Sequence, residues 1–505
     1  MTKKSLIFLW LILSLGIYLR LTKFINTFSL DTDQVQPFIL AGKIINSRRI
    51  LLLGYGPDRI NFMTPLYHYL VTFIYFFFRN ELIVTLIFSL LNISSIFVLF
   101  LFVKNILGTK SALLASLMFA LSFEMIKYSR NIMDPHLVPF FLLAAFLLLT
   151  GQTVKFPAAK IILSGIFFLI SLMYVSTYLV LPAYLYLLIR HLKLFRRNQK
   201  LITMAGLILL TVIFHTTVIQ YHIKTNFREL ASITSNSGSM NLLANPGKLI
   251  KSSTYNFFLI NQGFISDGNN FSANILIGSL LIILSVFLFL KSKKRKIFFP
   301  FIFLPFISAL LLSGVHIENY YLHRLSPLYI FYLIMFSALA VRILTYPGWK
   351  RKYTLLPLVF ILIFVVISLN LSAIQNYIFK ADFPFKKPHQ IAAYIIKKVK
   401  NYSYSMYVST PSEKTNYYVI EYLYALSKIK NKPVPVTTDD RGELHYNFNL
   451  QKEYLILICK DYPSDFKVNN DCFTLFTDEF SRKKNAFMKK FDTATVFIFE
   501  NNEKV

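Results

Sequence analysis

Long apolar runs separated by short basic clusters constrain this chain more than any other feature. Each run has roughly 17 to 25 residues, enough to cross the hydrocarbon core of a bilayer as a helix. Hydrophobic residues fill 55% of the 505 positions and include 51 Phe, which is typical of a polytopic membrane protein. The net charge of +30 does not indicate nucleic-acid binding, because the basic residues gather between the runs. We predict spans at about 5–22, 82–103, 109–126, 132–150, 161–176, 177–190, 201–220, 272–290, 297–314, 325–343 and 353–372.

The basic residues also predict the orientation of these spans. Lys3 and Lys4 precede the first run, which places the N-terminus in the cytoplasm by the positive-inside tendency. With eleven spans, 20 Lys and Arg residues fall in cytoplasmic segments, while the short outer loops hold only Lys127, Arg130 and Arg324. One span more or fewer would move the basic cluster 291–296 to the outside. Eleven is therefore the preferred number.

Three longer segments are then expected outside the cytoplasm: 23–81, 221–271 and the tail from about 380. The first contains an amphipathic piece after Asp33 and an apolar stretch, Pro65–Phe78, expected to lie in the membrane interface without crossing. The second is rich in Asn, Ser and Gly.

The tail differs in composition from the rest, since it holds 15 of the chain's 24 acidic residues. Its periodicity predicts strands at 404–410, 453–459 and 493–500 and helices at 389–399 and 416–428. The predicted fold is an all-α polytopic membrane protein over residues 1–379 with a small extracytoplasmic α/β domain over residues 380–505. Its two cysteines, Cys459 and Cys472, either pair or remain free thiols.

Acidic residues are rare before the tail, and two of the nine, Asp31 and Asp33, follow the first span together. Acids near a bilayer are expensive, which makes these two carboxylates functional candidates. One could act as a general base while the other holds a cation or an acceptor. The alternative is a surface turn in which Asp31 caps the next helix. The residues alone leave both interpretations open.

A second candidate is the short outer loop that contains Arg130 and Asp134. The Arg130 guanidinium could bind a phosphate in bidentate fashion. A plain Arg–Asp pair that caps the following helix is the structural alternative.

A third candidate is the outer segment 315–325, which carries His316, Glu318, His323 and Arg324. Cationic and hydrogen-bonding side chains at headgroup depth suit a lipid phosphate. An interfacial loop with aromatic belt residues is the alternative. A divalent metal at His316 and Glu318 stays open, because their spacing is not diagnostic.

Short motifs around these candidates follow a recognisable order. Asp33-Gln34 is followed eight residues after Asp33 by Ala41, and Thr64-Pro-Leu-Tyr67 opens the apolar stretch of the first outer segment. Arg130 near the outer end of the third span precedes Asp134.

A fourth motif, His323-Arg324-Leu-Ser-Pro327, precedes the next span. With the span count, these motifs resemble the glycosyltransferase-C superfamily, specifically its protein O-mannosyltransferase and aminoarabinose-transferase branch. The resemblance covers about residues 5–345. The tail resembles no domain that we can name.

The chain departs from the family pattern at three places. Gln34 stands where the family usually has Glu, and Thr64 replaces the first residue of a Pro-Pro-Leu motif. A Lys common near the fifth–sixth span junction is replaced by Ser176 or Thr177. Any role that needs a second carboxylate therefore falls to Asp31 or is absent.

The resemblance implies a membrane hexosyl or pentosyl transferase that moves a sugar from a polyprenyl-phosphate donor to a protein, lipid or glycan acceptor outside the cytoplasm. Asp33 would be the general base, with Asp31 as its helper. The donor phosphate would be held by Arg130, His316, His323 and Arg324, and Asp134, Gln34 and Glu318 would position donor or acceptor. The alternatives are a flippase or transporter for a lipid-linked glycan and a surface-glycan polymerase or ligase.

Overall fold

The computed structural model describes residues 2–28, 32–47, 50–53, 64–150, 157–226, 246–265, 295–315, 325–345, 355–379, 386–400, 403–409, 419–438, 444–446, 452–460, 484–491 and 494–500, with scattered positions between 278 and 290. The chain divides into two compact units. Unit 1 comprises Met1–Phe24, Leu51–Tyr67 and Leu82–Lys380, and unit 2 comprises Ile25–Ile50, His68–Glu81 and Ala381–Val505. Residues 25–50 and 68–81, both from the predicted outer segment 23–81, thus belong to the same compact unit as the tail.

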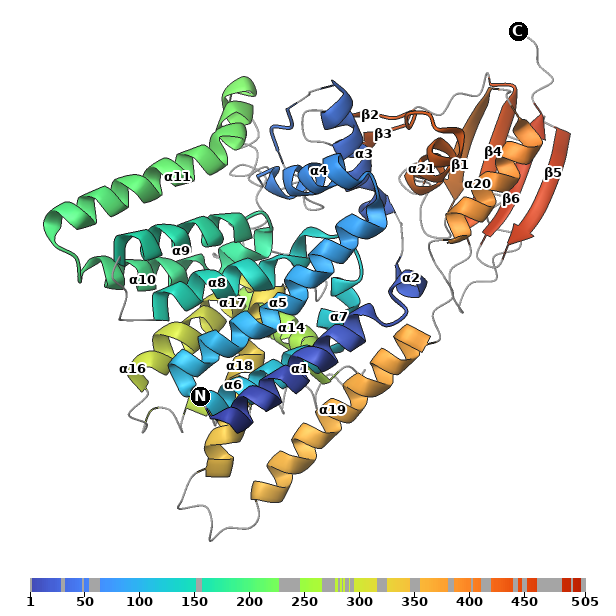
Figure 1. Cartoon of the computed structure of the whole chain (residues 1–505). Coiled ribbons are helices and arrows are strands. Elements are labelled where there is room, and N and C mark those ends of the chain that lie inside the picture. The colour runs from blue at the N-terminus through green and yellow to red at the C-terminus, as the bar shows by residue number, and fades with distance from the viewer. Residues whose placement is uncertain are drawn as a thin grey trace. The chain divides into compact units, whose positions relative to one another are not determined.

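Unit 1 is built from helices (Figure 1). Those before residue 200 are α1 (Lys3–Leu21), α5 (Glu81–Leu107), α6 (Thr109–Leu121), α7 (Phe123–Ser129), η1 (Asp134–His136), α8 (Val138–Thr150), α9 (Pro157–Ser171), η2 (Val175–Val180), α10 (Leu181–Leu192) and α11 (Arg197–Lys224). Those after it are α14 (Pro246–Ile265), α16 (Arg295–Phe298), η3 (Phe299–Phe303), α17 (Leu304–Val315), α18 (Ser326–Thr345) and α19 (Leu355–Phe379). The short α2 (Phe24–Thr27) lies at the unit boundary.

Helix α18 forms the centre of unit 1. Every residue from Ser326 to Ala340 is buried, and α6, α8, α17 and α19 all pack against it. A helix that is apolar on all sides can only be stable when neighbours or lipid cover its whole circumference. The apolar run predicted as a span at 325–343 is therefore the central, buried helix of unit 1.

Several described helices meet the length and hydropathy of a membrane span. Six do so, or seven if the bent pair α6–α7 counts as one span. Helices also occupy the predicted runs 132–150, 161–176 and 177–190, but they are shorter than a full span. Most of the predicted span 272–290 falls outside the described residues. The count of eleven spans and their orientation remain predictions.

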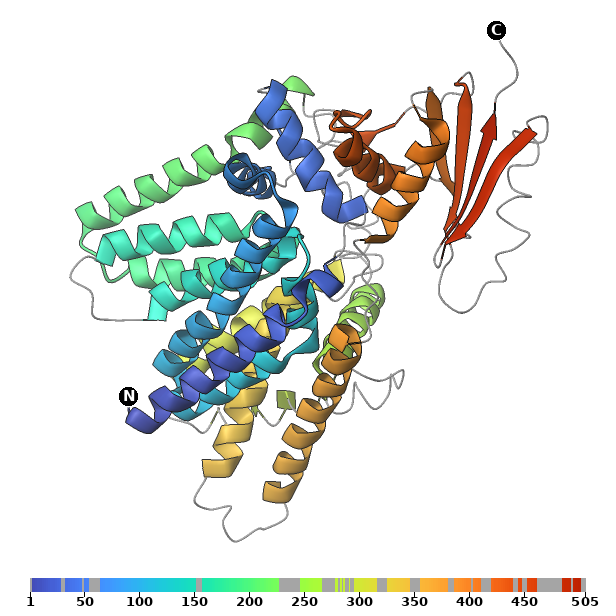
Figure 2. The same ribbon diagram turned by 45° about the vertical axis from the view of Figure 1, so that its right-hand side comes forward.

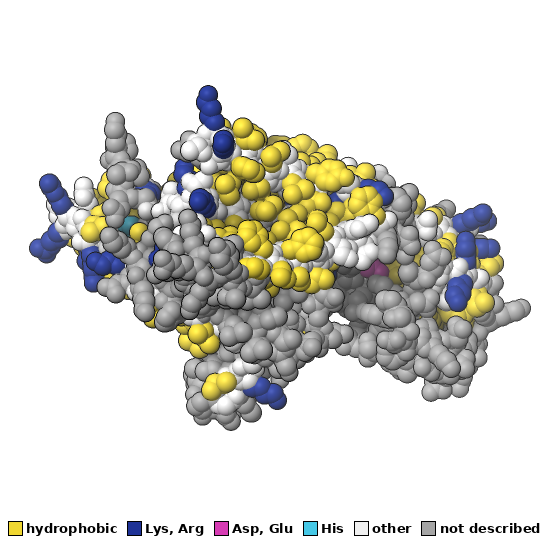
Figure 3. All heavy atoms as spheres, turned by 90° about the horizontal axis from the view of Figure 1, so that it is seen from below, with side chains coloured by type: hydrophobic (Ala, Val, Ile, Leu, Met, Phe, Trp, Pro, Cys, Tyr) yellow, Lys and Arg dark blue, Asp and Glu magenta, His cyan; other side chains and the backbone are white. Residues whose placement is uncertain are grey.

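The outer surface of unit 1 is apolar where lipid would contact it. Exposed large side chains include Trp10 on α1, Ile208 on α11 and Phe364 on α19, which is 70% exposed. Figure 3 shows a broad apolar area over one face of the molecule. Contiguous apolar areas of this kind indicate a membrane contact.

The third predicted span is broken between α6 and α7, which meet at a bend of 58°. Polar side chains satisfy the backbone there. The Ser122 hydroxyl accepts from the backbone N–H of Met125 and lies 2.7 Å from the Tyr329 hydroxyl, and the Asn370 amide oxygen accepts from the backbone N–H of Phe123 at 2.8 Å. Broken backbone at membrane depth requires such partners.

Unit 2 contains a mixed four-stranded sheet with the order β1-β4-β6-β5. Its strands are β1 (Tyr404–Ser409), β4 (Tyr454–Lys460), β5 (Lys484–Phe491) and β6 (Ala494–Glu500), and a small ribbon pairs β2 (Thr437–Thr438) with β3 (Leu444–His445). Strand β1 runs parallel to β4, and β6 is antiparallel to β4 and β5. Figure 2 shows α20 (Lys386–Val399) and α21 (Val419–Lys430) on the same side of this sheet. The three predicted strands and two predicted helices of the tail are all present, whereas β5 and the β2–β3 ribbon were not expected.

Two helices of the first outer segment complete unit 2. They are α3 (Thr32–Ser47) and α4 (Leu66–Phe78, from His68 onward in this unit). Helix α21 packs against α3 as well as against α20 and β1. Its residues from Val419 to Ser427 are all buried, so α21 is covered by neighbours on every side. The first-segment helices are thus part of the packing that buries α21.

Candidate functional site

Asp33 lies in the first turn of α3, and its side chain is exposed. The positive end of the helix dipole favours a carboxylate at this place. The residues that follow, 34–41, are all buried, and the Gln34 side chain is only 3% exposed. Packing therefore fixes the body of α3 while the carboxylate of Asp33 remains accessible.

Pro37 lies inside α3, four residues after Asp33. Proline has no N–H, so it cannot donate the usual helical hydrogen bond to the backbone carbonyl of Asp33. The first turn of α3 therefore lacks one of the backbone hydrogen bonds that the later turns have. Side-chain packing must supply the rest, and Phe38, which is 1% exposed, lies 5.5 Å ring to ring from Tyr75 of α4.

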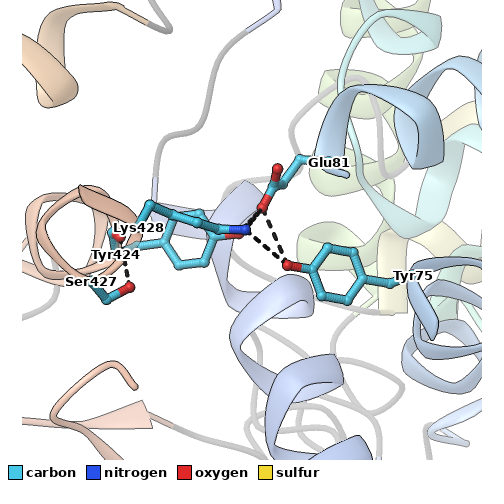
Figure 4. Close-up of polar contacts among 5 residues, drawn as sticks. All are labelled: Tyr75, Glu81, Tyr424, Ser427 and Lys428. Atoms are coloured by element: carbon cyan, nitrogen blue, oxygen red, sulfur yellow. Dashed lines mark hydrogen bonds and ion pairs between the residues drawn. The ribbon is translucent and has the colours of Figure 1, made fainter. Parts of the chain in front are cut away.

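A polar cluster of Tyr75, Glu81, Tyr424 and Lys428 joins α21 to the end of α4 (Figure 4). One carboxylate oxygen, Oε1 of Glu81, forms an ion pair with Lys428 and accepts hydrogen bonds from the hydroxyls of Tyr424 and Tyr75. The Lys428 ammonium also donates to the Tyr75 hydroxyl at 2.9 Å. It lies 5.5 and 5.4 Å from the centroids of the Tyr75 and Tyr424 rings, within cation–π range. We call these four residues the α4–α21 cluster.

The electrostatics of the α4–α21 cluster favour a charged ammonium and neutral phenols. Burial lowers the pKa of Lys428, but the hydrogen bond and charge of Glu81 outweigh it, so the pKa of Lys428 is raised. Burial and the charge of Glu81 raise the pKa of the Tyr424 phenol. The Glu81 side chain is 15% exposed and that of Lys428 is 35% exposed. A partly buried pair with further hydrogen bonds holds its geometry better than an open surface pair.

Arg130, in unit 1, is fully buried at the C-terminal end of α7. Its Nη2 donates to the backbone carbonyls of Leu19, at 3.3 Å, and Thr22 at the end of α1. Cationic side chains stabilise a helix C-terminus because the last carbonyls lack helical donors. In the structure Arg130 therefore caps α1, a role that the sequence did not suggest.

Arg20 of α1 in turn caps the end of α6. Its side chain is fully buried and donates to the backbone carbonyls of Phe119, at 3.2 Å, and Ala120, at 3.1 Å, where α6 ends. Its Nε donates to the side-chain oxygen of Asn92 at 3.0 Å, and Asn92 donates to the carbonyl of His136 at 3.4 Å. Two arginines thus tie α1 reciprocally to the broken span α6–α7 and to the loop after it.

Several expected site residues fall outside the described part of the chain. These are Asp31, His316, Glu318, His323 and Arg324, together with the side chain of Asp134, whose backbone begins η1. Among the residues that the structure describes, no group of three or more His, Cys, Asp or Glu is placed to hold a metal ion. A metal at His316 and Glu318 therefore stays an open question.

The structure adds residues that were not singled out from the sequence. Arg20 is a charge at the end of an otherwise apolar run, and Glu81 is one of the nine acids before the tail, so both were marked by rarity. Tyr75, Tyr424 and Lys428 carried no such signal, because tyrosines and lysines are common throughout the chain.

No protein-family model matches the chain, and no curated protein matches its sequence. Among solved structures, ArnT from Cupriavidus metallidurans in the apo state aligns with a TM-score of 0.55 over 98% of this chain and 97% of ArnT, at 11% identity. ArnT bound to undecaprenyl phosphate aligns over the same shares with a TM-score of 0.56 and 10% identity. The chain has the fold of ArnT. The alignment covers nearly all of both chains, so the helical part and the tail both contribute. The fold implied by the resemblance of the motifs is thereby confirmed.

Proposed function

We propose that this protein is a membrane glycosyltransferase that moves a sugar from a polyprenyl-phosphate carrier to an acceptor outside the cytoplasm. The observation that carries the proposal is the whole-chain similarity to ArnT, which has been solved bound to undecaprenyl phosphate. The exposed carboxylate of Asp33 on an otherwise buried helix supports it further. An accessible acid at the start of a fixed helix suits a group that must meet a substrate.

In the proposed reaction the acceptor hydroxyl oxygen attacks the anomeric carbon of the donor sugar. Asp33 takes the hydroxyl proton, and the bond from the anomeric carbon to the phosphate oxygen breaks with inversion. The bonding electrons leave with the polyprenyl phosphate. Asp31 is proposed as the helper of Asp33, and Gln34, Asp134 and Glu318 as residues that position donor or acceptor.

A phosphate leaving group requires cations that stabilise its developing charge. We assign this role to Arg130, His316, His323 and Arg324. For Arg130 the role competes with its hydrogen bonds to the end of α1, and a pair of arginine variants described below distinguishes the two. Hexosyl and pentosyl transfer both fit this chemistry, and so does a protein, lipid or glycan acceptor.

The proposed location is the cell membrane, with the N-terminus in the cytoplasm and the tail outside. The basic clusters between the spans support this orientation. Cys459 is disulfide-bonded in the structure, which suits an oxidising compartment. The other cysteine of the chain, Cys472, lies outside the described residues.

The test is a transfer assay with purified protein. Radiolabelled undecaprenyl-phosphate sugars are incubated with the protein and membrane extract, and labelled acceptor is separated from donor. Covalent transfer by the native protein, lost in Asp33→Asn, is expected. Movement of donor across vesicle membranes without covalent transfer would instead favour a flippase or transporter, and activity with a lipid-pyrophosphate glycan alone would favour a polymerase or ligase.

A further inference from the structure

Lys428 is 353 residues away from Tyr75 in the sequence, yet its ammonium and the Tyr75 hydroxyl both contact one carboxylate oxygen of Glu81. Glu81 is the first residue of α5, Tyr75 belongs to α4, and Lys428 lies near the end of α21. The α4–α21 cluster therefore joins the C-terminal domain to the segment that also bears Asp33. Figure 4 shows the side chains from the two sides pointing toward each other.

A path of described contacts leads from the cluster to α3. The ring of Tyr75, whose hydroxyl accepts from Lys428, packs 5.5 Å from the ring of Phe38, five residues beyond Asp33. Helix α21 itself packs along α3. At the far end of α3, the Lys43 ammonium donates to the carbonyl of Val436, in the segment after α21, at 2.6 Å.

We propose that the α4–α21 cluster makes the C-terminal domain a positioning element for Asp33. Lys428, Glu81 and Tyr75 hold α21 against α4, and α21 and α4 together hold α3, whose first turn is weakened by Pro37. The four cluster residues are positioning residues and touch no substrate. The catalytic consequence rests on the proposed function, whereas the effect on α3 does not.

The first measurement follows α3 directly and needs no activity. Asp33→Cys supplies one reactive thiol in the full-length protein, because the native cysteine Cys459 is disulfide-bonded. Labelling by a maleimide is timed in nanodiscs, alone and combined with Lys428→Met or Glu81→Gln. Both combinations are expected to raise the labelling rate about fivefold, because losing a contact raises the population of locally opened states.

The matched control is Lys430→Met, two residues further along α21. It removes the same charge from the same helix, but the Lys430 ammonium donates to the Lys400 carbonyl at 3.3 Å and does not belong to the cluster. Its labelling rate should equal that of Asp33→Cys alone. The charge exchange Glu81→Lys with Lys428→Glu should restore the labelling rate at least in part. If a charge variant fails to fold, Tyr424→Phe replaces it and should change the labelling rate less.

The second measurement is kinetic and uses proteins that retain Asp33. Lys428→Met and Glu81→Gln should lower kcat about tenfold with little change in the donor KM, because a misplaced base affects the chemical step more than donor binding. Unchanged labelling in folded cluster variants, or an equal change in Lys430→Met, would overturn the positioning role even if transfer is observed. Altered labelling without any transfer by the native protein would keep the positioning role and reject the proposed function.

Discussion

Asp33 and Arg130 are both rare charges beside predicted spans, but the structure surrounds them differently. Asp33 is exposed in the first turn of a helix whose following residues are buried. Arg130 is fully buried, and its Nη2 donates to two backbone carbonyls of α1. The rarity of a charge marked both positions equally. Burial separates a side chain that is accessible from one that holds two helices together.

The comparison also explains why the two sites should respond differently to substitution. A buried guanidinium that caps a helix contributes to folding, because its loss leaves carbonyls without donors. An exposed carboxylate contributes little to folding, so its loss should appear in the chemistry alone.

The largest expected effect is on transfer in Asp33→Asn. Removal of the proposed general base should lower kcat about 10²- to 10⁴-fold in the radiolabel assay. The unfolding free energy should change by less than about 1 kcal/mol, because substitutions of an exposed side chain at a helix N-terminus have small effects on folding. Near-native transfer by a well-folded Asp33→Asn protein would reject the base assignment.

Phe38→Ala and Phe73→Ala form a matched pair on the two first-segment helices. Phe38 is 1% exposed and Phe73 is 64% exposed. Phe38→Ala should lower the unfolding free energy by about 3–5 kcal/mol because it leaves a cavity beside Tyr75. Phe73→Ala should change it by about 0.5 kcal/mol or less in detergent. Equal melting temperatures would contradict the packing described for α3.

Arg130→Met and Arg20→Met test capping against phosphate binding. Both should lower the unfolding free energy by about 2–4 kcal/mol, measured by thermal unfolding in detergent, because each arginine donates to two carbonyls at a helix end. If Arg130 also binds the donor phosphate, only Arg130→Met should raise the donor KM. Equal donor KM values in the two variants would remove Arg130 from the phosphate site.

The smallest effect expected is a pH dependence from His68 of α4. Burial lowers the pKa of His68 from 6.5 to about 4, so protonation favours the unfolded state. The stabilisation is complete above pH 6.5 and is lost as the pH falls toward 4, by about 3 kcal/mol at most. His68→Gln should flatten the thermal stability profile between these pH values. Identical slopes in the two proteins would show that other groups cause the acid sensitivity.

Much of the tail could be predicted because its strands and helices have clear periodicity. Strand β5 was missed because its sequence, Lys484–Phe491, contains three lysines and, among the described strands, it pairs with β6 alone at the sheet edge. Edge strands carry lysines that block further pairing, and these also weaken the strand signal. The Tyr75–Lys428 contact could not be predicted, since no local pattern links residues 353 positions apart.

The sequence by itself determined that this is a helical membrane protein whose tail contains both strands and helices. Apolar run length and strand periodicity are local properties, and solvent or lipid acts on them segment by segment. Tertiary structure decided which charges are buried and which helix the tail packs against, because both depend on contacts between distant segments. Asp33 was visible in the sequence as a rare acid, but only the packing of α3 showed that its carboxylate is exposed on a fixed helix.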